Sequence, residues 1–142
     1  WEGHEESHHA ISHRTDPEGI ALHTEIQHFY ASQFAALLQR LKAVPEGDGT
    51  MLDNTVVVWG TPISESYKHV NRNVPFILGG ACGGYFETGR YLRWGSFDHN
   101  DAKNAEHGGR TNNDLLISLC HAMGQDDVEE FGNPDYCTGP LL

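Results

Sequence analysis

The stretch that begins at Asp16 constrains the fold most, because it is the longest part of the chain with one regular pattern. Asp16, Pro17 and Glu18 are typical of a helix start: a capping carboxylate, a proline at the first helical position and an acid in the first turn. Apolar residues then recur at helical spacing and form one stripe, at Leu22, Ile26, Phe29, Tyr30, Phe34, Leu37, Leu38 and Leu41. We expect a long helix that ends near residues 42–44.

Two short apolar runs follow this helix, and each has the composition of a buried strand. Residues 54–60 (NTVVVWG) are apolar on both faces, as parallel strands of a buried sheet are. Residues 74–80 (VPFILGG) run into a glycine-rich turn, and residues 89–94 are a candidate third strand. Polar connections separate the runs, at residues 45–50, 61–73 and 95–110.

A second helix is expected near the C-terminus, with Asn112 or Asn113 as its cap and Gly124 at its end. The order helix, strand, strand, helix indicates an α/β fold. Two or three strands make a poor sheet alone, so we expect an incomplete sheet with flanking helices, completed by another chain or a missing N-terminal half. We treat 1–142 as a single α/β region with a histidine-rich segment at 1–15 and an irregular tail at 125–142.

Charge and composition exclude several classes of partner. The chain has 142 residues and a formal net charge of −11. No basic stripe is present that could neutralise phosphates, which argues against nucleic acid, and anionic membrane surfaces are disfavoured for the same reason. No apolar run is long enough to span a bilayer. The chain begins at Trp1, and we expect it to be a processed chain, a proteolytic product or a piece of a longer chain.

The three cysteines, Cys82, Cys120 and Cys137, have no CxxC spacing, so a zinc ribbon is not expected. In an oxidising compartment one pair could form a disulfide, and we expect Cys120–Cys137, because an irregular tail is often tied down in this way. In a reducing compartment all three thiols would stay free.

Histidine and acid are concentrated in the first residues, where the run HEESHH at 4–9 is followed by His13. In a helix, His4 and His8 would lie one turn apart, as would His9 and His13, and such a pair can close on one metal ion. Glu5 and Glu6 could be ligands themselves, or could hydrogen-bond to the rings and fix their tautomer. The alternatives are a cluster that bonds to backbone and a solvated polar face.

Further candidates lie in the polar connections. Glu65 and His69 could complete a metal site, although an exposed loop pair is the simpler interpretation. The same alternatives apply to residues 98–101 (DHND) and 106–107 (EH). Ser7 stands beside His8, but no GxSxG elbow is present, so we do not expect a nucleophile there. Without CxxCH, haem could be held only non-covalently.

The HXXSHH run at 4–9 resembles the signature of a domain family of unknown function, found mainly in exported proteins of myxobacteria and planctomycetes. The similarity extends through further motifs in the same order, at residues 52–60, 73–80, 88–92, 122–124 and 136–141. It covers nearly the whole chain and matches the family's C-terminal half. It implies an exported bacterial protein, periplasmic or extracellular.

That family is similar in turn to the alkaline phosphatase and sulfatase superfamily, which implies an α/β sheet and a divalent metal ion (Zn, Fe, Mn or Ca). Its nucleophile lies on an N-terminal half that nothing in this chain matches. Relatives carry an acid two places after the strand glycine, where this chain has Pro62. The resemblance and the histidines together give the candidate metal ligands His4, His8, His9, His13, Glu65 and His69.

Two functions follow as expectations. The chain is the C-terminal part or subunit of an exported metal-binding hydrolase-like protein, in which a metal ion would polarise a phosphoryl, sulfuryl or acyl oxygen. Alternatively, it is a non-catalytic structural subunit of a larger extracellular or periplasmic assembly. The substitution at Pro62 and the small core favour the second function.

Overall fold

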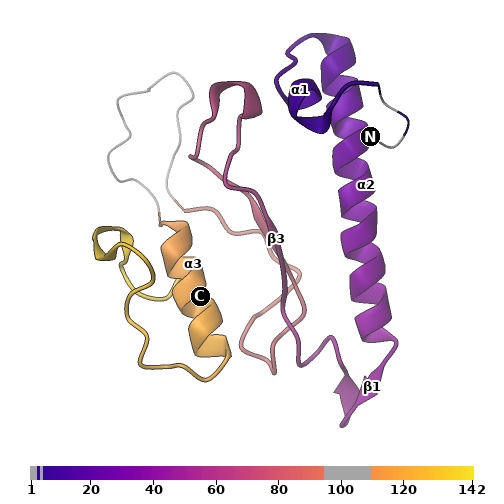
Figure 1. The fold of residues 1–142 in the computed structure, drawn as a ribbon. Coiled ribbons are helices and arrows are strands. Elements are labelled where there is room, and N and C mark those ends of the chain that lie inside the picture. The colour runs from indigo at the N-terminus through magenta and orange to yellow at the C-terminus, as the bar shows by residue number, and fades with distance from the viewer. Residues whose placement is uncertain (1–2, 4, 95–109) are drawn as a thin grey trace. The chain divides into compact units, whose positions relative to one another are not determined.

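The computed structural model describes residues 3, 5–94 and 110–142, and the chain is a mixed α/β protein of two compact units. The first unit holds residues 1–52 and 57–79, and the second holds residues 53–56 and 80–142. Figure 1 shows the helices and strands of both units along the chain. Each unit is treated separately below.

Helix α2 (Pro17–Lys42) is the main element of the first unit, and its predicted start is confirmed. The Asp16 side chain accepts a hydrogen bond from the Gly19 N–H at 3.0 Å, and the helix ends at the cap residue Ala43. Gly19 has a steric reason to lack a side chain, because a Cβ there would come within 2.2 Å of Arg14. The Asp16 carboxylate therefore fixes the helix start, and the missing side chain at Gly19 leaves space for Arg14 of the preceding turn.

Helix α1 (His8–Ser12) lies against α2 near its N-terminal end (Figure 1). Ile11 of α1 and Ile26 of α2 are both fully buried. Apolar burial of this kind is what holds so short a helix in place, because an isolated five-residue helix is not stable in water.

Two small antiparallel sheets complete the first unit. Strands β1 (Pro45–Glu46) and β2 (Gly49–Thr50) form a tight hairpin, and β3 (Val57–Gly60) pairs with β4 (Phe76–Gly79). The prediction of buried parallel strands was wrong, and both strands are shorter than expected. The connecting segment doubles back through the Glu65–Val70 bridge, so the chain returns beside itself instead of crossing over the sheet.

Helix α2 packs on one face of the β3–β4 pair. The Phe34 and Trp59 rings lie 5.6 Å apart, and a Cβ added at Gly79 would come within 2.6 Å of the Leu38 side chain. The register places Trp59 opposite Ile77, on the same face as Gly79. The glycine therefore lets the helix approach the sheet closely.

The second unit is built around α3 (Asn112–Ala122), which confirms the predicted second helix. Its cap residue is Thr111 instead of Asn112 or Asn113, and Gly124 follows it with a φ of 78°. Leu115, Ile117 and Phe86 are buried. The predicted third strand was wrong, because residues 89–94 have no regular structure in the part of the chain described here.

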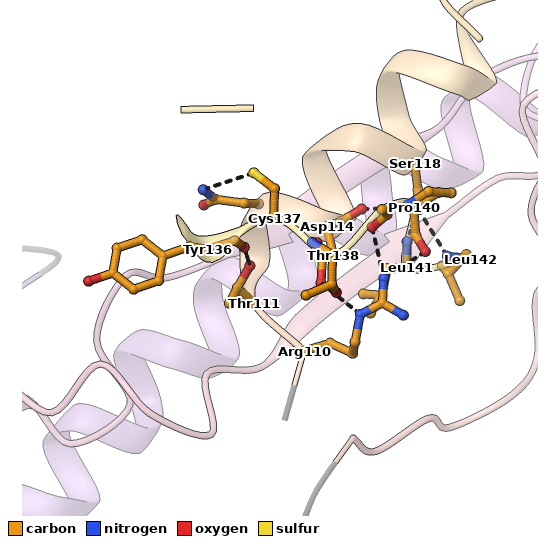
Figure 2. A network of polar contacts seen from close by, with 12 residues as sticks. Arg110, Thr111, Asp114, Ser118, Tyr136, Cys137, Thr138, Pro140, Leu141 and Leu142 are labelled. Carbon is orange, nitrogen blue, oxygen red and sulfur yellow. Dashed lines mark hydrogen bonds and ion pairs between the residues drawn. The ribbon is translucent and has the colours of Figure 1, made fainter. Parts of the chain in front are cut away.

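The tail after α3 is irregular apart from the 3-10 turn η2 (Pro134–Tyr136) and is held on the helix by polar contacts, as Figure 2 shows. The fully buried Asp114 carboxylate accepts hydrogen bonds from the Arg110 Nε at 2.7 Å, the Thr138 N–H at 2.7 Å and the Thr138 hydroxyl at 2.8 Å. Ser118 Oγ accepts the backbone N–H groups of the last two residues at 2.7 and 3.0 Å. Burial alone would raise the pKa of Asp114, but the hydrogen bonds from Arg110 and Thr138 outweigh it and lower the pKa.

The three cysteines are free thiols, so the expected Cys120–Cys137 disulfide is not formed. Cys137 Sγ instead accepts the Phe131 N–H at 3.3 Å within the tail. Among the described residues, no helix has the length and apolar character needed to cross a membrane.

Candidate functional site

Ser7 sets the start of α1 in the histidine-rich segment. Its hydroxyl oxygen accepts a hydrogen bond from the Ala10 N–H at 3.2 Å, and His13 is the C-cap of the helix. The serine is therefore a helix cap, which is a structural role. This cap fixes which side chains of the segment share a face.

Arg14 organises the turn between α1 and α2. Its guanidinium donates to Asp16 at 2.7 and 3.0 Å and to Glu18 at 2.8 Å, and it lies 3.5 Å from Glu6. These bonds hold the pKa of Asp16 well below its ordinary value and raise the pKa of Arg14. Glu6 is thus part of an exposed ion-pair network with Arg14.

Three imidazoles from two distant parts of the chain meet beside α1. His9 and His13 are one helical turn apart, with ring centroids separated by 4.7 Å and planes at 68°. His69, which follows the 3-10 turn η1 (Ser66–Lys68), has its ring centroid 4.9 Å from that of His13. His13 is the common neighbour, and we call these three residues the histidine row.

The spacing of the histidine row can be compared with that of metal ligands. A tetrahedral ion held through nitrogens at about 2.1 Å places the centroids of two imidazole ligands roughly 5 Å apart. Both ring pairs have this spacing. Within residues 3, 5–94 and 110–142, however, no group of three or more His, Cys, Asp or Glu side chains is arranged so that it could hold a metal ion. His9 and His69 are both exposed.

His8 does not join the row, although it is the neighbour of His9 in sequence. Its ring lies 5.8 Å from that of His23 and 6.0 Å from that of Tyr30, both on α2. The His23 Nε2 lies 3.2 Å from the Gln27 side-chain nitrogen. Burial lowers the pKa of His23, and the nearby His8 lowers it further. His8 is therefore part of the contact between α1 and α2.

The other predicted candidates are placed as follows. Glu65 precedes η1, and its carboxylate lies 3.4 Å from the Lys68 ammonium. His4 lies outside the described residues, as do residues 98–101 and 106–107. Of the six predicted ligands, the structure places His9 and His69 each beside His13.

The second unit contains a cavity of about 470 Å³ beside the end of α3. Its lining includes His121, Cys137 and the carboxylates of Asp126, Glu129 and Glu130. The His121 Nε2 lies 2.8 Å from the Val128 carbonyl oxygen, which orients the ring. The carboxylates are exposed to solvent, and the cavity is a weaker candidate than the histidine row.

Sequence reasoning missed two features. The contact between His8 and His23 was not predicted, because it joins two helices and local spacing gives no signal for it. The buried Asp114 was missed as well; its signal was Arg110 four residues earlier, at the start of a predicted helix. Comparison of the chain with protein-family models, with curated proteins and with solved structures finds no match.

Proposed function

We propose that this chain is the metal-binding C-terminal part, or a subunit, of an exported hydrolase-like protein of the phosphatase and sulfatase type. The histidine row is its metal site. One observation supports the proposal above the others: His13 has two imidazole neighbours, at centroid distances of 4.7 and 4.9 Å, and one of them comes from a distant segment. These are spacings at which two rings can share an ion.

The donor chemistry of the row fits a transition metal. Neutral imidazole is the most common protein ligand for Zn²⁺, Fe²⁺, Cu²⁺ and Ni²⁺, whereas Ca²⁺ and Mn²⁺ prefer oxygen. A bound ion would act as a Lewis acid on a phosphoryl, sulfuryl or acyl oxygen. The chain contributes the position of the rings: the Ser7 cap and the Arg14 network fix the helix that carries His9 and His13.

A partner completes the sheet in this proposal. The β3–β4 pair has two strands, and so small a sheet depends for its stability on packing against other elements. Phe76 and Ile77 on β4 remain 37% and 47% exposed. We propose that another chain, or an N-terminal half that carries the nucleophile, covers such residues.

Replacing His13 tests the proposal, because this residue is shared by both ring pairs. The chain and its His13→Ala variant are dialysed with Zn²⁺, and bound zinc is titrated by calorimetry. We expect about one ion per chain, and an affinity at least roughly 10-fold weaker in the variant, since even changes outside the ligand shell cause losses of that size. His28→Ala, an exposed histidine on α2, is the matched control and should bind like the unmodified chain. Equal affinities for the two variants would contradict the proposal.

A second candidate function is a non-catalytic structural subunit. It is favoured by the exposed apolar side chains of β4 and by the missing convergence of three ligands in the described part of the chain. A chain that binds no zinc but co-purifies with a stoichiometric partner would support this function instead.

A further inference from the structure

A short segment of the second unit, residues 137–142, lies along α3, and we call it the strap. Arg110, just before the helix, donates to two backbone carbonyl oxygens of the strap at 2.8 and 2.7 Å. Asp114 and Ser118 accept hydrogen bonds from three of its backbone N–H groups (Figure 2). Residues four positions apart on a helix share a face, so these side chains hold the strap from one side of α3.

The attachment of the strap consists mainly of hydrogen bonds to its backbone. One side-chain bond is added by the Thr138 hydroxyl, which donates to Asp114 at 2.8 Å. The Tyr85 hydroxyl donates to the Leu142 carbonyl oxygen at 3.2 Å. Leu141 and Leu142 are only half-buried, so apolar burial contributes less to the attachment than it would for core side chains. Each hydrogen bond makes a modest net contribution, so the strap depends on the whole set.

The chain that leads from α3 toward the strap has the properties of a hinge. Residues 123–133, all within the described part of the chain, form turns and irregular structure. Gly124 and Gly132 have φ values of 78° and 76°, which glycine adopts without the steric cost of a Cβ. A surface segment with an irregular connection can open locally while the rest of its unit stays folded.

The strap also closes the cavity of about 470 Å³ beside the end of α3. Residues 137–140 of the strap line this cavity together with His121 of the helix. Apart from His121, all of its lining residues belong to the strap or to the segment 123–133. The cavity therefore has its present walls only while the strap is attached to α3.

We propose that the strap is a gate for this cavity: it leaves α3 as one piece, turning about residues 123–133, and its return closes the cavity. Asp114 and Ser118 each accept more than one hydrogen bond from the strap, so loss of one bond weakens its neighbours and opening is cooperative. The gate lies in the second unit and does not depend on the histidine row, which lies in the first.

The Cys137 thiol reports whether the strap is open. It is half-buried, and its Sγ accepts the Phe131 N–H at 3.3 Å. The full chain is treated with fluorescein maleimide, and the labelling rate of each cysteine is measured by mass spectrometry of its peptides. Ser118→Ala removes an acceptor at the far end of the strap from Cys137. We expect this variant to label Cys137 about 10-fold faster, because the open strap becomes more populated, while labelling of Cys82 in the same unit stays unchanged.

Ser32→Ala is the matched control. The Ser32 hydroxyl donates to the carbonyl oxygen four residues earlier, as that of Ser118 does, but it lies on α2 in the first unit. Its labelling rates should equal those of the unmodified chain.

Thr138→Val is a second test, because it removes an exposed hydroxyl of the strap instead of a buried side chain of the helix. It should also accelerate labelling of Cys137 and leave Cys82 unchanged, and it decides the question if Ser118→Ala does not give the circular dichroism of the unmodified chain. Equal acceleration at Cys82 and Cys137 would overturn the gate, because the whole unit would then open. An unchanged rate at Cys137 would overturn it as well, because the bonds to α3 would not hold the strap.

Discussion

At the scale of single residues, neighbouring histidines make different contacts because successive residues of a helix point in different directions. His8 and His9 are adjacent on α1, but successive residues of a helix point about 100° apart. The ring of His8 therefore meets His23 on α2, while the ring of His9 meets His13. A sequence motif that counts both as ligands does not account for this divergence, and the structure assigns them to separate contacts.

Partial burial of the His23 ring, together with the nearby His8, makes stability depend on pH. The pKa of His23 lies below its ordinary value of 6.5 in the folded chain, so the unfolded chain takes up the proton first as the pH falls. Stability from this residue is complete above pH 6.5 and declines as the pH falls from there toward the lowered pKa. We expect the free energy of unfolding to fall more between about pH 7.5 and about pH 5.5 in the unmodified chain than in His23→Gln. Urea denaturation at both pH values measures this difference.

His28→Gln is the control for this experiment, because His28 is an exposed residue of the same helix. It should keep the pH dependence of the unmodified chain. The same pH dependence in His23→Gln as in the control would show that the partly buried His23 ring is not its source.

At the scale of elements, the tail is attached to α3 by buried polar bonds. Asp114 accepts from Arg110 and Thr138 while fully buried, and Ser118 receives the N–H groups of the last two residues (Figure 2). Buried polar groups that are fully bonded specify one geometry, and loss of one partner leaves the others unsatisfied. The order of the tail thus depends on a few side chains of one helix.

Asp114→Asn should destabilise the second unit by about 2–4 kcal/mol, because it leaves Arg110 without its charge partner and removes an acceptor of the Thr138 bonds. Urea denaturation followed by circular dichroism measures the loss. Asp127→Asn, at an exposed turn residue, is the control and should change stability by no more than about 0.5 kcal/mol. A comparable effect of the two substitutions would contradict the role of Asp114.

The elements differ in how far the sequence predicted them. The start of α2 was correct because Asp16 and Pro17 act locally, through a cap and a fixed φ. The predicted direction and burial of β3 and β4 were wrong, because apolar composition reports neither strand direction nor how many faces of a strand are covered. The path was decided by hydrogen bonds of Ser64 and Glu65 within the connecting segment, for which the sequence carries no comparable signal.

The candidate site was predicted in the same uneven way. The His9–His13 pair followed from helical spacing, and the structure confirms that the two rings are neighbours. His69 was named as a candidate, but its contact with His13 depends on a left-handed residue and on the return of the chain past α2. Such tertiary contacts are not encoded in local spacing.

At the scale of the whole molecule, the net charge and the two-stranded β3–β4 sheet bear on the proposed function. A net charge of −11 favours cations and disfavours nucleic acid. The two-stranded β3–β4 sheet and the exposed side chains of β4 call for a partner surface in the proposed assembly. The histidine row would give that assembly a metal ion at a position set by the first unit alone.

X-ray absorption at the zinc edge tests this account most directly, because it reports the atoms bound to the ion. The full chain is loaded with one equivalent of Zn²⁺ and compared with His13→Ala. The account predicts nitrogen neighbours at about 2.0–2.1 Å with the outer-shell scattering of two or three imidazoles, and loss of imidazole scattering in the variant. A spectrum with oxygen neighbours only, or one unchanged in His13→Ala, would contradict the metal site.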